Sequence, residues 1–462
     1  MQAQRMLLVG PPQASVAIDA ECALYTLEYR YVDAAPDDGF AAWRTESGES
    51  VEKIDVLRDC EAFSGGYTRH ALNRFFGQAL LRHKPSVVVI IGLSGATADL
   101  PRVASLLGVP VVLQLDRPGE DLALLDAATV NWLRASLDDC DRVLPGTAAK
   151  DDWPATWLAG LDLTGGVGLA EAATGLDRGA PDYRYDYAIH EFCQRDHPLL
   201  VAMQAGEARH FSGCRQVLDL ACGVGIFLDC LRREGIAGAG VERDPRIARY
   251  ARGMGLDVVT EDALAYLESG AGDFDAVHCS HFIEHLPAEA VTGLLELLFE
   301  RLPAGGVLVL VFPDPESIRS QLLGFWRDPE HVRFYHPELV AAMATASGFE
   351  LEFSSYDEQP HRVVPFAEDP PALPSLAVTA TAAEAAAVGP FERLLGLFGL
   401  ASTGRRVGQL EQRLERLTAG MLRQAEASRA LEARTDVLWD INRTWAWNDN
   451  ATLRLRKPAD SV

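Results

Sequence analysis

Continuous apolar runs alternate with helix-length segments in the first part of the chain. Residues 5–10, 85–92 and 109–115 are rich in Val and Ile and bounded by Gly or Pro, which predicts parallel strands buried on both faces. The helix-length segment 93–108 lies between the last two runs, so a right-handed βαβ unit is the expected topology. Residues 1–158 are therefore predicted to be an α/β domain whose strand ends face a ligand crevice.

The same alternation returns after residue 216. Five strand-like runs, VLDLA, AGAGVE, DVVT, FDAVHCS and VLVLVF, follow one another with helical segments between them. This is the pattern of an open, doubly wound sheet, which we place within residues 183–358. The Gly-rich stretch 159–182 has few anchoring aromatic residues and is predicted to be a linker between the two α/β domains.

Residues 359–462 differ from the two α/β regions in composition and in the spacing of apolar residues. Residues 359–404 are rich in Pro and Ala and predict a second linker, whereas residues 405–438 space apolar side chains by three and four among Arg and Glu. The seam consists of Val407, Leu410, Leu414, Leu417, Met421, Leu431 and Leu438, and is interrupted at Gln424, Ser428 and Thr435. We expect a coiled-coil helix that supports a homo-oligomer. Residues 439–462 carry three tryptophans and a basic cluster, which favours either an anchor at an anionic membrane or a docking peptide.

Composition narrows the class of protein. The 462 residues, 48% of them hydrophobic, suffice for two or three domains with ordinary cores. A formal net charge of -24 disfavours general affinity for nucleic acid, and we expect no nucleic-acid partner. The eight cysteines contain no Cys-x-x-Cys pair, so neither a disulfide framework nor a thiolate zinc site is predicted. With no signal or membrane span at the start of the sequence, we expect a cytoplasmic protein, peripheral at the inner face of the membrane if the tail anchors it.

A glycine loop and three acidic residues mark a candidate ligand site in the second domain. Asp219 ends a buried strand, and Gly223 and Gly225 follow in the turn, where the lack of a side chain lets the backbone approach a ligand closely. Glu242 ends the second strand about 20 residues later, where a carboxylate can accept hydrogen bonds from both hydroxyls of a ribose. Asp262 follows the third strand at a similar interval.

This arrangement resembles the class I S-adenosylmethionine-dependent methyltransferases, which carry an acidic-x-Gly-x-Gly loop and acidic residues after the second and third strands. The resemblance implies a Rossmann-like methyltransferase sheet with S-adenosylmethionine as the methyl donor. A dinucleotide fingerprint fits less well, because Leu228 stands where a third glycine is expected. By the resemblance, the loop holds the methionine part, Glu242 the ribose, and Asp262 with Ala263 the adenine. The matching positions are Asp219, Ala221, Gly223, Gly225, Glu242, Asp262 and Ala263.

Three histidines, His281, His285 and His331, are the candidate catalytic residues. Methyl transfer to oxygen is an in-line displacement in which one proton must be removed, and a near-neutral histidine suits that task. The alternative for His285 is a structural hydrogen bond at the start of its own helix. His281-x-x-Glu284-His285 also fits an inverted zinc-protease pattern. Because it follows a strand end and no distal ligand stands out, we expect no metal.

The segment 325–350 is dense in Trp, Arg, His and Tyr, and in similar enzymes it caps the acceptor pocket. Arg327, Arg333 and Tyr335 would suit a sugar or phosphorylated acceptor, because guanidinium groups bind phosphate in a bidentate way and aromatic rings pack on sugar faces. A lid held by internal salt bridges, such as one between Asp328 and Arg333, is the alternative. The run Trp-Arg-Asp-Pro-x-His-Val-Arg resembles methyltransferases of bacterial surface polysaccharide synthesis, which implies a glycan or glycan-lipid acceptor and contact with a polysaccharide synthesis complex.

Residues 56–116 resemble the N-terminal, acceptor-binding half of GT-B glycosyltransferases of family-4 type. The nucleotide-sugar half does not follow, and Ile91-Gly92-Leu93 stands where such proteins have Asp or His after the central strand. We therefore expect a domain without glycosyl transfer activity. It would be either a glycan-binding domain, with Gly65, Gly66, Gly92 and Ser94 at the crevice, or a wholly structural one.

The expected function is O-methylation of a sugar or phosphosugar in bacterial surface polysaccharide synthesis. Two alternatives remain. One is a glycosyltransferase-related or noncatalytic scaffold protein of a polysaccharide synthesis complex, and the other is an O-methyltransferase for a small, quinone-like molecule. A scaffold is expected not to bind S-adenosylmethionine.

Overall fold

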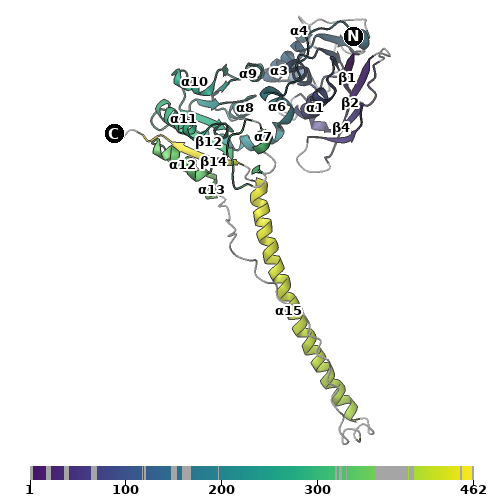
Figure 1. Cartoon of the computed structure of the whole chain (residues 1–462), viewed down its shortest axis with the longest axis vertical. Helices are drawn as coiled ribbons and strands as arrows, with labels where there is room; N and C mark the ends of the chain where they lie inside the picture. Colours follow the sequence, from purple (N-terminus) through teal and green to yellow (C-terminus); the bar gives the residue numbers. More distant parts are fainter. Residues whose placement is uncertain are drawn as a thin grey trace. The chain divides into compact units, whose positions relative to one another are not determined.

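Two seven-stranded sheets, seen in a computed structural model, organise the chain (Figure 1). The structure describes residues 4–16, 22–35, 41–63, 70–116, 118, 121–146, 153, 155–158, 168–195, 197–317, 320–321, 325–328, 330–358, 394, 400–447 and 450–459. The chain divides into two compact units. One comprises residues 1–313, 325–354 and 451–462, and the other residues 314–324 and 355–450. Both sheets belong to the first unit.

The first sheet has the strand order β3-β4-β2-β1-β5-β6-β7 and is parallel except for β3. Its strands are β1 (Arg5–Gly10), β2 (Ala23–Val32), β3 (Ala42–Ser47), β4 (Val51–Leu57), β5 (Val87–Ile91), β6 (Val111–Leu115) and β7 (Arg142–Pro145). The helices are α1 (Asn73–His83), α2 (Leu100–Leu106), α3 (Ala127–Asp138) and the short α4 (Ala155–Leu158). The three predicted strands and the predicted α/β class are confirmed. The prediction missed β2 because its residues are mostly half-buried, with charged side chains among the apolar ones.

The second sheet has the order β10-β9-β8-β11-β12-β14-β13. All five predicted strands are present, as β8 (Val217–Leu220), β9 (Gly238–Glu242), β10 (Val258–Thr260), β11 (Ala276–Ser280) and β12 (Val307–Pro313). The helices between and after them are α8 (Ile226–Arg233), α9 (Pro245–Gly253), α10 (Ala263–Glu268), α11 (Ala288–Arg301) and α12 (Pro337–Ala346). These five strands are parallel, so their carboxyl ends meet at one edge of the sheet.

The last strand of this sheet comes from the end of the chain. β14 (Asn450–Arg456) lies between β12 and β13 (Glu350–Ser354) and runs antiparallel to β13. Ala451, Leu453 and Leu455 on β14 are at most 1% exposed. This strand corrects two predictions, that the domain ends at residue 358 and that residues 439–462 form a separate tail.

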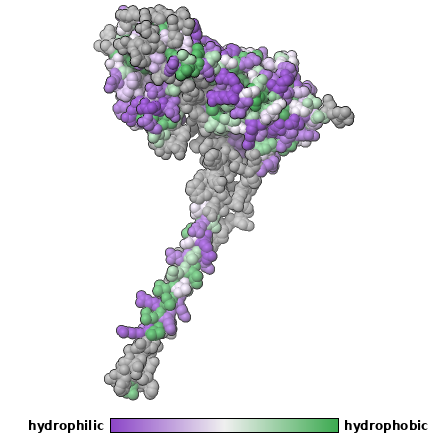
Figure 2. Space-filling view, turned by 180° about the vertical axis from the view of Figure 1, so that it is seen from behind, coloured by the Kyte–Doolittle hydropathy of each residue, from purple (hydrophilic) through white to green (hydrophobic). Residues whose placement is uncertain are grey.

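A long helix occupies the connection between β13 and β14. After α13 (Ser355–Glu358), α15 runs from Leu400 to Trp447, beyond both ends of the predicted coiled-coil segment. Six of the seven seam side chains are 48% to 72% exposed, and Figure 2 shows hydrophobic patches among hydrophilic ones along this helix. The seventh, Leu438, and most of the linker 359–404 lie outside the described side chains. Pairing of the helix with a second copy stays a prediction. Of the described helices, none combines the length and apolar character needed to cross a membrane.

The predicted linker 159–182 is in part a packed element. Residues 159–167 lie outside the described residues, but α5 (Leu169–Ala172) packs on the first sheet, and Ala172 is fully buried beside Met6 and Leu8. After it, α6 (Tyr187–Gln194) crosses α1 so closely that a Cβ at Gly77 would lie 2.2 Å from the sulfur of Cys193. One hydrophobic core therefore continues between the two α/β parts, which the sequence analysis had separated.

Candidate active site

A pocket opens at the carboxyl ends of β8, β9, β10 and β11. It is lined by the loop after β8, the ends of the neighbouring strands and two preceding helices, α6 and α7 (His197–Ala205). The lining residues are Tyr187, Glu191, Arg195, Leu200, Gln204, Ala221, Cys222, Gly223, Val224, Ile226, Val241, Glu242, Arg243, Glu261, Asp262, Ala263, Leu264, Ser280, His281, Phe282, His285, Leu286 and Glu330. Five of the seven predicted cofactor residues are among them. Asp219 and Gly225 are not.

The loop after β8 brings backbone to the pocket. Ala221 and Gly223 both have a φ of 55°, in the left-handed region that a residue with a Cβ adopts at a cost. A strained non-glycine residue such as Ala221 is typical of a functional site. Gly225 serves packing, because a Cβ there would lie 2.4 Å from Leu256. Gly225 also has a φ of 83°, so both its backbone conformation and the close contact with Leu256 favour glycine.

Glu242 is the central acidic residue of the pocket. Its carboxylate accepts hydrogen bonds from the backbone amides of Gly223, at 3.1 Å, and Asp244, at 2.8 Å. The side chain is buried, and burial raises its pKa to about 7 although both amides act in the opposite direction. The carboxylate is thus held rigidly at the end of β9, in the position expected of a ribose acceptor.

Asp262 and Ala263 line the far end of the pocket, at the start of α10. The Asp262 side chain caps this helix and accepts from the amides of Leu264 and Ala265, at 3.0 and 3.1 Å. The capped turn fixes the backbone beside Ala263, which is buried. The pocket therefore passes from the glycine loop, past Glu242, to this turn, which is the order in which the family resemblance places the methionine, ribose and adenine groups.

Asp219 is turned away from the pocket and toward a buried histidine. Its Oδ1 lies 2.7 Å from Nδ1 of His278, whose Nε2 lies 2.9 Å from the carboxylate of Glu207. The His278 ring also stacks on Phe227 with centroids 3.6 Å apart. Burial would lower the pKa of His278, but the two carboxylates outweigh it and raise the pKa to about 9. We interpret Asp219 as part of a buried ionic triad that supports the cofactor loop.

His278→Gln is expected to destabilise the protein by about 3 kcal/mol or more, because two buried carboxylates lose their cation. The folded-state pKa of His278 lies above its unfolded value of 6.5, so its contribution is complete below pH 6.5 and is lost as the pH rises through about 9. Thermal melting between pH 6.5 and 9.5 would measure both effects. The variant should melt lower at neutral pH and show a flatter pH dependence. Equal melting curves at all pH values would contradict this role.

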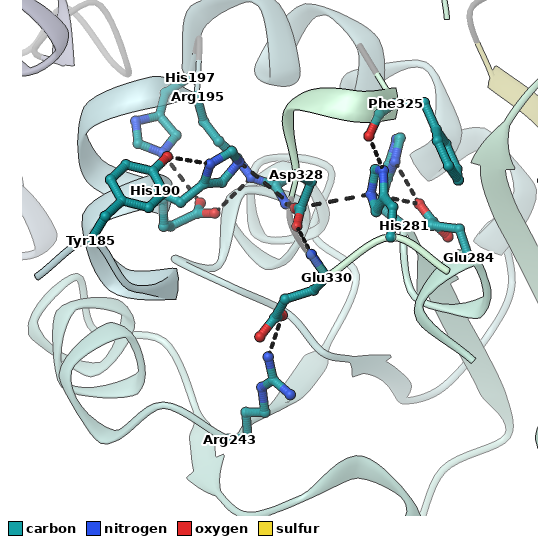
Figure 3. A network of polar contacts seen from close by, with 12 residues as sticks. Tyr185, His190, Arg195, His197, Arg243, His281, Glu284, Phe325, Asp328 and Glu330 are labelled. Carbon is teal, nitrogen blue, oxygen red and sulfur yellow. Dashed lines mark hydrogen bonds and ion pairs between the residues drawn. The ribbon is translucent and has the colours of Figure 1, made fainter. Parts of the chain in front are cut away.

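The predicted catalytic histidines lie at the end of the pocket nearest β11. His281 and His285 line it, whereas His331 stands behind His285 with ring centroids 4.7 Å apart. His281 has a φ of 52°, a second strained non-glycine residue at the pocket. Its Nδ1 lies 3.1 Å from Oε1 of Glu284, which belongs to the turn η5 (Ile283–His285) (Figure 3).

The predicted acceptor-binding residues are not gathered in the pocket. Tyr335 is buried and its hydroxyl donates to the carbonyl of Leu286 at 2.7 Å, so it is a structural residue. Arg333 is exposed and lies over the Tyr335 ring. The side chain of Arg327, in the turn η7 (Phe325–Arg327), lies outside the described part of the chain. Asp328 faces His190 at 3.7 Å and Arg195 at 3.9 Å (Figure 3). It also lies 3.9 Å from His331.

Several pocket residues were missed by the sequence analysis. Glu191 and Arg195 of the α6 region form an ion pair at 2.8 Å, and Arg243 pairs with Glu330. The charge of Arg195 and a hydrogen bond from His197 outweigh burial and lower the pKa of Glu191 to about 2. Their spacing, i and i+4 at the end of a short helix, is common on helices and gave no signal of a site.

The fold and the pocket together define a Rossmann-like domain with its pocket at the strand ends, where folds of this class bind their ligands. Residues 185–352 match a family model described as a methyltransferase domain. A ubiquinone biosynthesis O-methyltransferase of Pectobacterium atrosepticum is 30% identical over 99 residues, which are 20% of this chain and 41% of that protein. Its counterpart in Psychrobacter arcticus is 28% identical over 153 residues, 29% of this chain and 59% of that protein.

A solved SAM-dependent methyltransferase from Archaeoglobus fulgidus is 22% identical, with a TM-score of 0.37 over 59% of this chain and 100% of its own. The chain spans 41% and 59% of the length of the two curated relatives. Residues 185–352 are a SAM-dependent methyltransferase domain, and its methyl donor is S-adenosylmethionine. The predicted enzyme class and cofactor are confirmed.

Proposed function

We propose that this chain transfers the methyl group of S-adenosylmethionine to a hydroxyl oxygen of a sugar or phosphosugar in bacterial surface polysaccharide synthesis. One observation carries the methyl-transfer part of the proposal. The pocket that contains the predicted cofactor residues Gly223, Glu242 and Ala263 continues without a break to His281 and His285. The bound cofactor supplies an electrophilic methyl group on a sulfonium, and the histidines supply a site for the acceptor's proton.

His281 is the better oriented of the two bases. Because the carboxylate of Glu284 can only accept a hydrogen bond, Nδ1 of His281 donates to it at 3.1 Å. Nε2 then keeps its lone pair and can take a proton, the arrangement of a base oriented by a carboxylate. Phe282 and Leu286 supply apolar surface beside it, which helps to exclude water from the transfer.

The sugar part of the proposal is supported by the segment after β12. Trp326 is 70% exposed and Arg333 is exposed, the residue types that pack on sugar rings and bind phosphate. His331 of the same segment touches His285 of the pocket. The family likeness of this segment favours a glycan or glycan-lipid acceptor, and the reaction is then cytoplasmic, next to a polysaccharide synthesis complex. The first sheet would assist by binding glycan near Ser94, whose hydroxyl is 2.6 Å from that of Tyr31.

A quinone-like phenol is the second candidate acceptor. It is favoured by the curated relatives, which are named ubiquinone biosynthesis O-methyltransferases. The chain differs from them in length and contains α15, for which we propose self-association through its exposed seam.

Incubating the full chain with methyl-labelled S-adenosylmethionine and two acceptor pools tests the proposal. One pool holds lipid-linked or released surface glycan, and the other polyprenyl catechols. Label in a glycan product, located on a sugar oxygen by mass spectrometry and lost in His281→Asn, is the expected result. Label only in the catechol pool would overturn the sugar proposal in favour of the second candidate. Failure to bind S-adenosylmethionine would favour a scaffold.

A further inference from the structure

Five potential metal ligands converge beside the pocket from two distant parts of the sequence. Ligand atoms of Glu284, His285 and His331 all lie within 4.8 Å of one another, and the same holds for His285, Asp328 and Glu330. An ion about 2.1 Å from each ligand atom holds its ligands within about 4 Å of one another, so only small side-chain movements would close this set around one ion. His285 belongs to both groups and also lines the pocket.

His331 is held in the form that can bind a metal. Its Nδ1 lies 2.7 Å from the carbonyl oxygen of Phe325, and because a carbonyl only accepts, Nδ1 carries the proton. Nε2 therefore keeps its lone pair, 4.0 Å from Oε1 of Glu284 and 3.9 Å from Oδ2 of Asp328. Donation of the second ring N–H to a backbone carbonyl is the usual support of a metal-bound histidine.

The buried carboxylate of Glu284 is an independent observation that points to a cation at this place. Its side chain is 1% exposed, and while Oε1 faces His281, Oε2 has no hydrogen-bond partner among the described residues. A buried carboxylate oxygen without a partner is costly, and a cation between Glu284 and the neighbouring histidines would compensate it.

The backbone fixes the two segments to each other. The amides of Val332 and Arg333 donate to the carbonyl of Glu284 at 2.8 and 3.3 Å. These bonds keep His331 beside His285 by contacts that involve no ligand atom. The backbone positions of the ligand residues are therefore fixed in advance, so only side-chain movements are needed to bind an ion.

We propose that Glu284, His285 and His331, with Asp328 as a fourth ligand, bind one divalent transition-metal ion beside the pocket. Two imidazoles combined with carboxylates favour ions such as Zn²⁺, Mn²⁺ or Co²⁺ over Mg²⁺ or Ca²⁺. This revises the expectation from the sequence, where the motif at 281–285 lacked a distal ligand. The structure supplies His331 and Asp328 for that role.

The catalytic role that we assign to this ion rests on the proposed methyl-transfer function. An acceptor hydroxyl bound to the ion would become more acidic and would pass its proton to Nε2 of His281. The oxygen then bonds to the methyl carbon, the carbon–sulfur bond breaks, and its electron pair stays on sulfur, which leaves a neutral thioether. The ion would thereby select acceptors with an oxygen that can reach it.

Metal titration of the tag-free, chelator-treated full chain tests this site. Mn²⁺ binding is followed by electron paramagnetic resonance and Co²⁺ binding by its visible absorption. One site per chain is expected, weakened about tenfold or more in His331→Gln. His336→Gln is the matched control, because His336 caps α12 outside the cluster, and it should bind like the wild type. Asp328→Asn is a second ligand variant in case His331→Gln does not fold.

S-adenosylmethionine binding, measured on the same samples, shows whether each variant is folded and keeps the two proposals apart. A wild-type chain that binds the cofactor but neither Mn²⁺ nor Co²⁺ overturns the metal site and leaves methyl transfer standing. Equal metal affinity in the wild type and in both ligand variants also overturns it. If the site binds metal as expected but no glycan is methylated, the proposal of a sugar acceptor is contradicted and the metal site stands.

Discussion

Glu242→Gln is expected to weaken S-adenosylmethionine binding by a factor of about 10 to 100, since a hydrogen bond to a charged acceptor contributes about 1.5–3 kcal/mol. Both oxygens of Glu242 already accept backbone amides, from Gly223 and Asp244. A glutamine must turn its NH₂ group toward one of these donors, so it disturbs the glycine loop as well as the ribose contact. Titration calorimetry measures the change. Glu268→Gln, an exposed carboxylate on α10, should bind as the wild type does.

The pH dependence of the same titration shows whether the negative charge of Glu242, and not only the size and geometry of its side chain, contributes to cofactor binding. Burial raises the pKa of this carboxyl to about 7, so it is largely protonated at pH 6 and largely ionised at pH 8. If the ionised form binds the ribose, wild-type affinity should rise about tenfold between these values, because one pH unit below the pKa leaves about a tenth of the groups ionised. The glutamine variant should lack this rise. A flat wild-type profile would argue against a charged acceptor.

Leu455→Asp is expected to cost about 4 kcal/mol or more and to abolish a cooperative thermal transition of the methyltransferase domain. Leu455 is fully buried on β14, between β12 and β13, and an aspartate there places an unpaired charge in the core. The matched control is Leu422→Asp on α15, where the side chain is 61% exposed and lies off the predicted seam. Its melting temperature should stay within about 2 °C of the wild type.

Two deletions test the same strand more directly. Ending the chain after Trp447 removes β14 and should abolish S-adenosylmethionine binding. Replacing residues 359–447 with a short Gly/Ser linker should preserve it, because Ser354 of β13 pairs with Leu453 of β14 and a turn can join them. A truncated chain that still binds the cofactor would show that β14 is dispensable.

The cofactor end of the pocket was predictable because its signals are local. Gly223, Glu242 and Ala263 lie at or just after the ends of three successive strands, and parallel strands bring such residues to one edge. The same motif misplaced Asp219, since its partner His278 lies 59 residues further along the chain on β11. The register between β8 and β11 places Asp219 beside His278, and Asp219 does not line the pocket.

The parallel strands β1, β5, β6 and β8 to β12 could be read from the sequence, because apolar runs bounded by Gly or Pro are local patterns. Their helices follow from periodicity in the same way, as does the part of the long helix α15 predicted at 405–438. Only the tertiary structure decided that residues 450–456 complete the second sheet and that His331 lies beside His285. Both pairings join segments that are far apart in the sequence. The partner that stabilises each segment is therefore absent from any short window of sequence around it.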